Sequence, residues 1–185
     1  MNYTNKIIKC CQHLRKGNII IYPTDTILGL GCDATNENAI KNLIKLKKRN
    51  KNKGLIILVE SLNMLSNYVE EIPSIALKKI KTTKYPTTII YNNPKNLPKI
   101  LYNNDSIAIR ITKNIHCKNI ISTINKPIVS TSANISGNPI PEDFHNIEKE
   151  LTLKVDFILE EKMINYAKTP SKIYKIENNK MILIR

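Results

Sequence analysis

Residues 19–34 read Ile-Ile-Ile-Tyr-Pro-Thr-Asp-Thr-Ile-Leu-Gly-Leu-Gly-Cys-Asp-Ala, and the predicted fold is organised around this stretch. The β-branched run from Ile19 to Ile21 predicts a short strand that is buried on both faces. Pro23 lacks a backbone donor, so we expect the strand to end there. Residues 24–26 then place two hydroxyls and a carboxylate where the strand leaves the sheet. These groups could hold a small polar molecule, or they could form an ordinary turn between two core segments.

Short apolar runs alternate with helical patterns along the rest of the chain. Helices are expected at 4–16, from 36 to the basic run that begins at 45, at 61–68, 73–82 and 115–124, and from 141. Further strands are expected at 55–59, 86–91, 106–111, 155–159, 171–176 and 181–184, and just before Ser130; residues 92–104 are expected to form a surface loop. This alternation predicts an α/β protein with a mixed sheet, and the absence of a convincing linker predicts one domain over residues 1–185.

The chain carries 29 lysine and arginine residues against 15 aspartate and glutamate residues, a formal net charge of +14. Such a charge favours polyanionic partners such as a nucleotide or RNA. However, the sequence is rich in Lys, Asn, Ile and Tyr, the residues that A/T-rich codons specify. Only clustered charge therefore supports an anion-binding role, and the densest basic run covers residues 45–54.

Known catalytic signatures are missing from the sequence. It contains no Gly-x-Ser-x-Gly, Walker or Gly-x-Gly-x-x-Gly motif, and His13, His116 and His145 fall in helical segments that we expect to be peripheral. The four cysteines have no Cys-x-x-Cys pair and no metal-ligand spacing with the histidines, so we expect buried, reduced thiols and no protein-bound metal. No apolar run reaches the roughly 20 residues that span a bilayer, and no signal peptide is evident. A cytoplasmic protein without membrane contact is predicted.

Two polar pairs remain as candidates for ligand binding. Lys47 and Arg49 lie two residues apart where the chain leaves a predicted helix, and both could reach one triphosphate. They could equally form a solvated basic helix end that complements the helix dipole. Ser132 and Asn134 follow a short strand at the same spacing and could point to one ligand, or they could belong to a polar turn that Gly137 closes.

In combination, these motifs resemble the YrdC-like threonylcarbamoyl-AMP synthases, in their short bacterial form. The matching segments occur in order along nearly the whole chain: Tyr22–Thr26 with Gly29–Ala34, Lys47-x-Arg49 with residues 53–58, Pro86 with Thr88, Arg110, residues 130–137, and Pro170–Ile173. Two positions depart from the family pattern, because the segment before Thr88 lacks its Pro-Gly-Pro and Asn50 replaces a proline. The resemblance implies a single-domain, twisted mixed sheet with flanking helices around a basic cavity.

The resemblance also implies a reaction in which L-threonine, bicarbonate and ATP, with Mg²⁺ arriving on the ATP, give threonylcarbamoyl-AMP and pyrophosphate. A downstream threonylcarbamoyl transferase complex would use this product to modify tRNAs that read codons beginning with A, and direct RNA contact is possible. The implied catalytic residues are Lys47, Arg49, Ser132 and Asn134; the implied substrate-binding residues are Thr24 or Thr26, Thr88, Arg110 and Ser171. Threonine's amine would be the nucleophile, so the protein would act by positioning and by cationic stabilisation.

Two other functions compete with this interpretation. One is a non-catalytic RNA-binding protein, such as a ribosome maturation factor, which would use the same basic cavity. Aromatic residues make up only 5% of the chain and tryptophan is absent, so no platform for stacking single-stranded bases is evident. The other is an adenylyl transferase of the same fold with a different acceptor. Pyrophosphate release that depends on threonine would separate the enzyme from the RNA-binding protein. Replacing threonine by other amines would separate the two enzymes.

Overall fold

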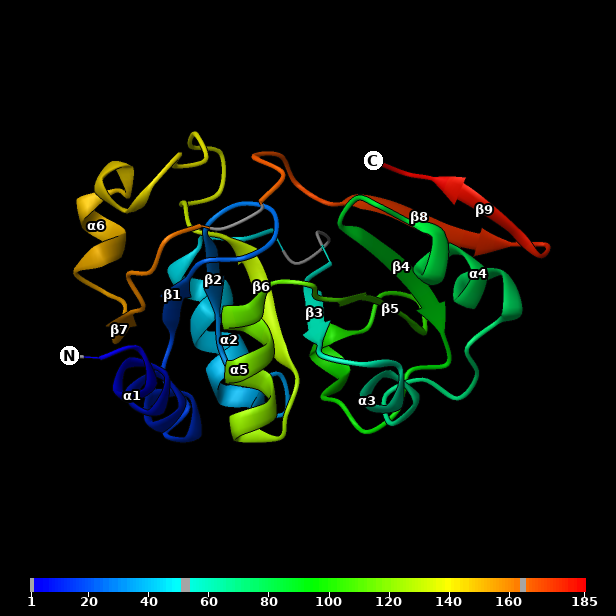
Figure 1. The fold of residues 1–185 in the computed structure, drawn as a ribbon, viewed down its shortest axis with the longest axis horizontal. Helices are drawn as coiled ribbons and strands as arrows, with labels where there is room; N and C mark the ends of the chain where they lie inside the picture. Colours follow the sequence, from blue (N-terminus) through cyan, green and yellow to red (C-terminus); the bar gives the residue numbers. More distant parts are fainter. Residues whose placement is uncertain (1, 51–53, 164–165) are drawn as a thin grey trace.

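The structure of the chain is a computed structural model that describes residues 2–50, 54–163 and 166–185. Strands within these ranges form one twisted sheet with the order β7-β1-β2-β6-β3-β5-β4-β8-β9 (Figure 1). The strands are β1 (Ile20–Tyr22), β2 (Gly29–Gly31), β3 (Ile56–Val59), β4 (Thr87–Asn92), β5 (Ser106–Ile111), β6 (Ile128–Ser132), β7 (Phe157–Ile158), β8 (Lys172–Glu177) and β9 (Lys180–Leu183). The pairs β1–β7, β3–β5 and β4–β8 are parallel and the other neighbours are antiparallel, which confirms the mixed α/β class.

Helices flank this sheet. They are α1 (Tyr3–Arg15), α2 (Glu37–Leu46), α3 (Leu62–Ser66), α4 (Ser74–Thr82), α5 (Ile115–Ile124) and α6 (Lys149–Thr152), with 3-10 turns η1 (Lys99–Leu101) and η2 (Phe144–Asn146). Helices α1 and α5 pack side by side, and α1 also contacts β1 and β7 (Figure 1). Helix α4 contacts β9 near the opposite edge. Among the described helices, none has the length and apolar character required to cross a membrane.

Local chemistry fixes where most helices begin. The side chains of Asn36, Ser61 and Asn114 each accept a hydrogen bond from a backbone N–H in the first turn of α2, α3 and α5. Residues 36 and 61, where the sequence predicts that helices start, are thus the caps of α2 and α3. Pro73 was expected as the first residue of a helix, but it stands one residue earlier, at the N-cap of α4.

Two sequence-based expectations were wrong in part. The segment 92–104 is not simply a surface loop, because it forms η1 and buries Leu97 and Leu101 in the core. Pro141 does not open a longer helix. Instead, the Asp143 carboxylate accepts the backbone N–H groups of the η2 turn, and a separate short helix, α6, begins only at Lys149.

The order of the central strands brings two distant polar segments together. The β1–β2 hairpin carries the polar turn at residues 24–26, and β2 pairs with β6 so that Gly29 lies opposite Ser132. The polar ends of β1 and β6 therefore lie close together, although more than 100 residues separate them along the chain. This arrangement positions the candidate site.

Gly31 allows this close approach, and its replacement by alanine is expected to destabilise the protein. A Cβ at position 31 would collide with the backbone carbonyl of Val129 and with the buried ring of Tyr22. We expect Gly31→Ala to lower the free energy of unfolding by at least about 2 kcal/mol, measured by urea denaturation. Gly54→Ala is the matched control, because among the described residues no atom beyond its chain neighbours lies within 4 Å of the added Cβ there. Equal stability of the two variants would contradict this account of the strand packing.

Candidate active site

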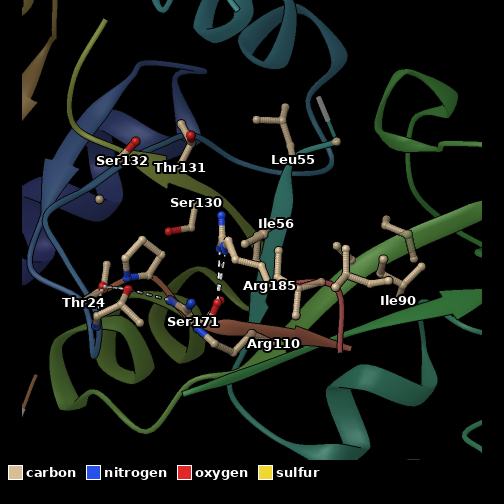
Figure 2. A pocket seen from close by; sticks show the side chains of 18 of the residues that line it. Thr24, Leu55, Ile56, Ile90, Arg110, Ser130, Thr131, Ser132, Ser171 and Arg185 are labelled. Carbon is tan, nitrogen blue, oxygen red and sulfur yellow. Dashed lines mark hydrogen bonds between the residues drawn. The ribbon is translucent and has the colours of Figure 1, made fainter. Parts of the chain in front are cut away.

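A cavity of about 290 Å³ lies where the polar ends of these strands meet (Figure 2). Its walls come from the turn after β1, the segment after α2, strands β3 to β6, and the β8–β9 hairpin. Its polar lining residues are Thr24, Thr26, Arg49, Asn103, Ser106, Arg110, Ser130, Thr131, Ser132, Ser171 and Arg185. Isoleucines from β3, β4, β5 and β8 supply much of the apolar remainder, so the cavity has one strongly cationic part and one apolar part.

The turn after β1 is rigid and presents two hydroxyls to the cavity. Thr24 Oγ1 lies 2.9 Å from Thr26 Oγ1, donates to the carbonyl of Ile27 at 2.6 Å and accepts the N–H of Thr26 at 3.0 Å. Both threonines are almost fully buried and both line the cavity, so the geometry leaves either able to contact a ligand.

Arg110 is held at the same wall by a buried ion pair. Its Nη2 lies 3.1 Å from Oδ1 of Asp25 and donates to Thr26 Oγ1 at 3.5 Å. Both charged side chains are nearly inaccessible to solvent, and Arg110 Nε has no hydrogen-bond partner among the described residues. Because the Arg110 guanidinium also lines the cavity, it is suited to an anionic ligand group such as a carboxylate.

Ser171 lies opposite this turn, at the start of β8. Its hydroxyl is 2.8 Å from the hydroxyl of Thr88, which is completely buried on β4 behind the cavity wall. Thr88 therefore does not line the cavity and instead fixes the orientation of Ser171.

Lys47 has turned inward at the end of α2. A Schellman motif ends the helix: Lys48 has a left-handed φ of 49°, Lys48 N–H donates to the carbonyl of Lys45, and Arg49 N–H donates to that of Ile44. This turn leaves Lys47 only 2% exposed. The alternative of a solvated basic helix end thus does not describe Lys47.

The ammonium group of Lys47 lies against Ser132 and Asn134. Its Nζ donates to the carbonyl of Ser132 at 2.6 Å, to the carbonyl of Asn134 at 2.8 Å and to Asn134 Oδ1 at 2.9 Å, with Ser132 Oγ at 3.2 Å. Ser132 Oγ also donates to Asn134 Oδ1 at 2.6 Å. Burial, and then the charge of Arg49, lower the pKa of Lys47 to about 8, while Glu148 acts in the opposite direction.

The predicted pairs therefore form a contiguous site with two layers. Arg49 and Ser132 reach the cavity, whereas Lys47 and Asn134 lie behind its wall and contact Ser132 directly. Arg49 donates to the carbonyl of Gly54 at 2.7 Å and to Thr131 Oγ1 at 3.5 Å. The basic run at 45–54 includes residues 51–53, which lie outside the described residues.

Arg185 is a site residue that sequence reasoning missed. Its guanidinium donates to the carbonyl of Ser171 at 3.3–3.4 Å and lies in the cavity (Figure 2). The missed signal is the two-residue turn Asn178–Asn179, in which both residues have positive φ, as a type I′ hairpin requires. That turn sets the β8–β9 register and places Arg185 opposite the residues that follow Ser171.

Three arginines thus converge on one cavity. Burial, and then the charge of a neighbouring arginine, lower the pKa of both Arg49 and Arg185; the neighbour is Arg185 for the first and Arg110 for the second. Guanidinium groups stay charged at any physiological pH, so the three neighbouring positive charges repel one another and attract an anion into the cavity. The expected basic cavity is therefore present.

No histidine or cysteine is among the described residues that line the cavity. His116 was expected at the periphery, but it is buried, with Nδ1 2.9 Å from the Tyr3 hydroxyl because α1 packs over α5. All four cysteines are free and buried, as predicted, and burial raises the pKa of the Cys117 thiol to about 12. Such a thiol is a poor nucleophile at neutral pH. Among the described residues, no group of three or more His, Cys, Asp or Glu side chains could hold a metal ion.

Comparison with known proteins gives consistent matches. The Sua5_yciO_yrdC family model, described as telomere recombination, matches residues 12–185. A protein of Buchnera aphidicola subsp. Baizongia pistaciae named threonylcarbamoyl-AMP synthase is 36% identical over 178 residues, which cover 94% of this chain and 95% of that protein. A protein of the same name from Wigglesworthia glossinidia brevipalpis is 36% identical over 187 residues, covering 98% and 94%.

A solved structure agrees with these matches. The crystal structure of P. abyssi Sua5 complexed with L-threonine superposes with a TM-score of 0.87 at 27% identity. The match covers 97% of this chain but only 53% of the P. abyssi protein, so the chain spans about half the length of that relative. Since the family model and the relatives match nearly the whole sequence, the chain belongs to the Sua5/YciO/YrdC family.

Proposed function

We propose that this protein is an L-threonylcarbamoyladenylate synthase, which converts L-threonine, bicarbonate and ATP into threonylcarbamoyl-AMP and pyrophosphate. The observation that carries the proposal is the contact of Lys47 with Ser132 and Asn134 at the wall of a cavity that three arginines line. The names of the relatives, and the L-threonine bound to the P. abyssi protein, support the same activity.

The cationic part of the cavity suits the triphosphate. Arg49 and Ser132 would contact phosphate oxygens directly, with Asn134 supporting Ser132 from behind the cavity wall. The ammonium of Lys47 has three protons, which four protein oxygens share in this structure. A phosphate oxygen could replace one of these acceptors, and the positive charge would then stabilise pyrophosphate as it leaves.

The part of the cavity that Arg110 lines suits threonine. Arg110, which lines the cavity, would bind the carboxylate, and the hydroxyls of Thr24 or Thr26 and of Ser171 would orient the amino acid or its carbamate. The neutral amine of threonine would attack CO₂ with loss of a proton to solvent, or bicarbonate with loss of water, to form a carbamate. A carbamate oxygen would then attack the α-phosphorus of ATP, and pyrophosphate would leave. No side chain acts as a covalent nucleophile in this scheme.

Other components follow from this activity. Mg²⁺ would arrive bound to the phosphates of ATP, as is common for magnesium in nucleotide sites. The product would pass to a threonylcarbamoyl transferase complex that modifies tRNA, in the cytoplasm, and the basic surface would permit contact with RNA.

The reduced pKa of Lys47 predicts how ATP binding depends on pH. The charged ammonium favours the triphosphate, so ATP affinity should fall as the pH rises through about 8 and this proton is lost. Calorimetric titration of ATP between about pH 7.5 and 9.5 tests this, because phosphate protons are already lost below that range. In Lys47→Ala we expect weaker binding that is independent of pH; an unchanged pH profile in that variant would disprove the assignment to Lys47.

An omission assay tests the proposed function. Pyrophosphate release from ATP should require both L-threonine and bicarbonate, and other amino acids or amines should support it poorly. Release with a different acceptor would favour another adenylyl transferase. Absence of release from folded protein, together with tight and salt-sensitive RNA binding, would favour the RNA-binding alternative.

A further inference from the structure

The loop that carries Asn134 has little regular structure of its own. It runs from the end of β6 to Asn138, and Gly137 within it has a φ of +99°. Its backbone is held by the bond from Ala133 N–H to the carbonyl of Leu28 at 3.0 Å, and by the bond from Ser136 N–H to the carbonyl of Lys47, just after α2, at 2.9 Å. The position of the Asn134 amide therefore depends on side chains that fasten this loop.

The carboxylate of Glu148 fastens the loop at two points. Oε1 accepts the backbone N–H of Ile135 at 3.0 Å, and Oε2 accepts Nδ2 of Asn138 at 2.7 Å. Glu148 is half-buried and stands at the N-cap of α6, ten residues beyond Asn138, so it joins α6 to the loop. Hydrogen bonds to a charged acceptor are the stronger kind, which suits a clamp.

A continuous chain of hydrogen bonds connects Glu148 to the ammonium group of Lys47. Asn134 Nδ2 donates to the carbonyl of Asn138 at 2.6 Å, and Asn134 Oδ1 accepts from Lys47 Nζ at 2.9 Å. Because its nitrogen is held by Asn138, the Asn134 amide is oriented with its oxygen toward Lys47. The path thus runs from Glu148 through Asn138 and Asn134 to Lys47.

The charge of Glu148 also affects Lys47. Among the described residues, Arg49 and Glu148 are the charged groups whose fields act on Lys47, with opposite signs. Glu148 raises the pKa of Lys47, whereas burial and Arg49 lower it. A negative charge at position 148 therefore keeps more of Lys47 protonated near neutral pH.

We propose that Glu148 is a positioning residue for the nucleotide site: its carboxylate holds the Asn138–Asn134 relay so that the Asn134 amide oxygen and the Lys47 ammonium stay against Ser132, at the cavity wall beside the proposed triphosphate site. This inference rests on the proposed function. It assigns a role to a residue that does not line the cavity, and that no motif in the sequence marks.

The test compares Glu148→Gln with Glu150→Gln. Glutamine keeps the size of the side chain but removes its charge and one of its two acceptors. Glu150 is the matched control, because it is exposed, lies two residues further along and pairs only with Lys48 and Lys154 among the described residues. We expect Glu148→Gln to raise the Kd of ATP by about 10- to 100-fold, the loss expected for a charge-assisted hydrogen bond. The affinity of Glu148→Gln for L-threonine should stay near the wild-type value. The affinity of Glu150→Gln for ATP should also stay near the wild-type value.

A second readout separates positioning from a general loss of structure. In Glu148→Gln, the fall of ATP affinity with pH should begin at a lower pH than in the wild type, because Lys47 has lost its neighbouring negative charge. In the double variant Lys47→Ala/Glu148→Gln, the pH dependence should be absent. If Glu148→Gln kept the wild-type ATP affinity and pH profile, the inference about Glu148 would be overturned, while the proposed function would stand. Failure of the wild-type protein to bind ATP would instead count against the proposed function.

Discussion

Lys47→Ala is expected to lower kcat/KM for ATP by about 10²- to 10³-fold, the largest loss of any single substitution in the nucleotide site. The reason is that Lys47 is the group in contact with both Ser132 and Asn134, so its removal takes away a buried positive charge and also releases the two residues it orders. Steady-state pyrophosphate release, with threonine and bicarbonate saturating, measures this effect.

Folding must be measured alongside activity. Without the ammonium, the carbonyl of the buried residue Asn134 loses its donor and the carbonyl of Ser132 loses one of its donors, which should lower the free energy of unfolding by about 1–3 kcal/mol in urea denaturation. The matched control is Lys45→Ala, which removes an exposed lysine from the same helix. A folded Lys47→Ala protein with wild-type turnover would refute the role given to Lys47.

Loss of Arg110 is expected to have a comparable effect on the other substrate. Its removal should weaken L-threonine binding by about 100-fold, because a carboxylate loses a charge-assisted partner in a buried site. ATP affinity should change far less, since Arg110 lies against Thr26 and Asp25 rather than at the Lys47 cluster. Calorimetric titration with each substrate separates the two effects.

The variant Arg110→Ala also loses stability. Arg110→Ala leaves the buried carboxylate of Asp25 without its partner, which costs about 3–5 kcal/mol of stability. The double variant Arg110→Ala/Asp25→Asn removes both charges and should recover much of that loss. If the stable double variant bound threonine as tightly as the wild type, Arg110 could not be the carboxylate partner.

The features that could be predicted from the sequence are those that local chemistry determines. Pro23 ends β1, and the side chains of Asn36 and Ser61 cap helices, because each acts on backbone groups within a few residues of itself. The polar ends of β1 and β6 were also recognisable, since an apolar run leads directly into clustered hydroxyls in both.

The features that could not be predicted depend on contacts between distant segments. Lys47 and Ser132 lie 85 residues apart in sequence, and only the approach of the segment after α2 to the end of β6 turns a basic helix end into a buried ammonium. His116 is buried because α1 covers α5, which no local pattern indicates. The roles of Arg185 and Glu148 required the hairpin register and the course of a loop.

The most direct test of the account is product formation from radiolabelled bicarbonate with ATP, Mg²⁺ and L-threonine, omitting each substrate in turn. The account predicts one labelled product, threonylcarbamoyl-AMP, that appears only when bicarbonate, ATP and threonine are all present and is nearly lost in Lys47→Ala. Folded wild-type protein that gives no labelled threonylcarbamoyl-AMP under these conditions would contradict it.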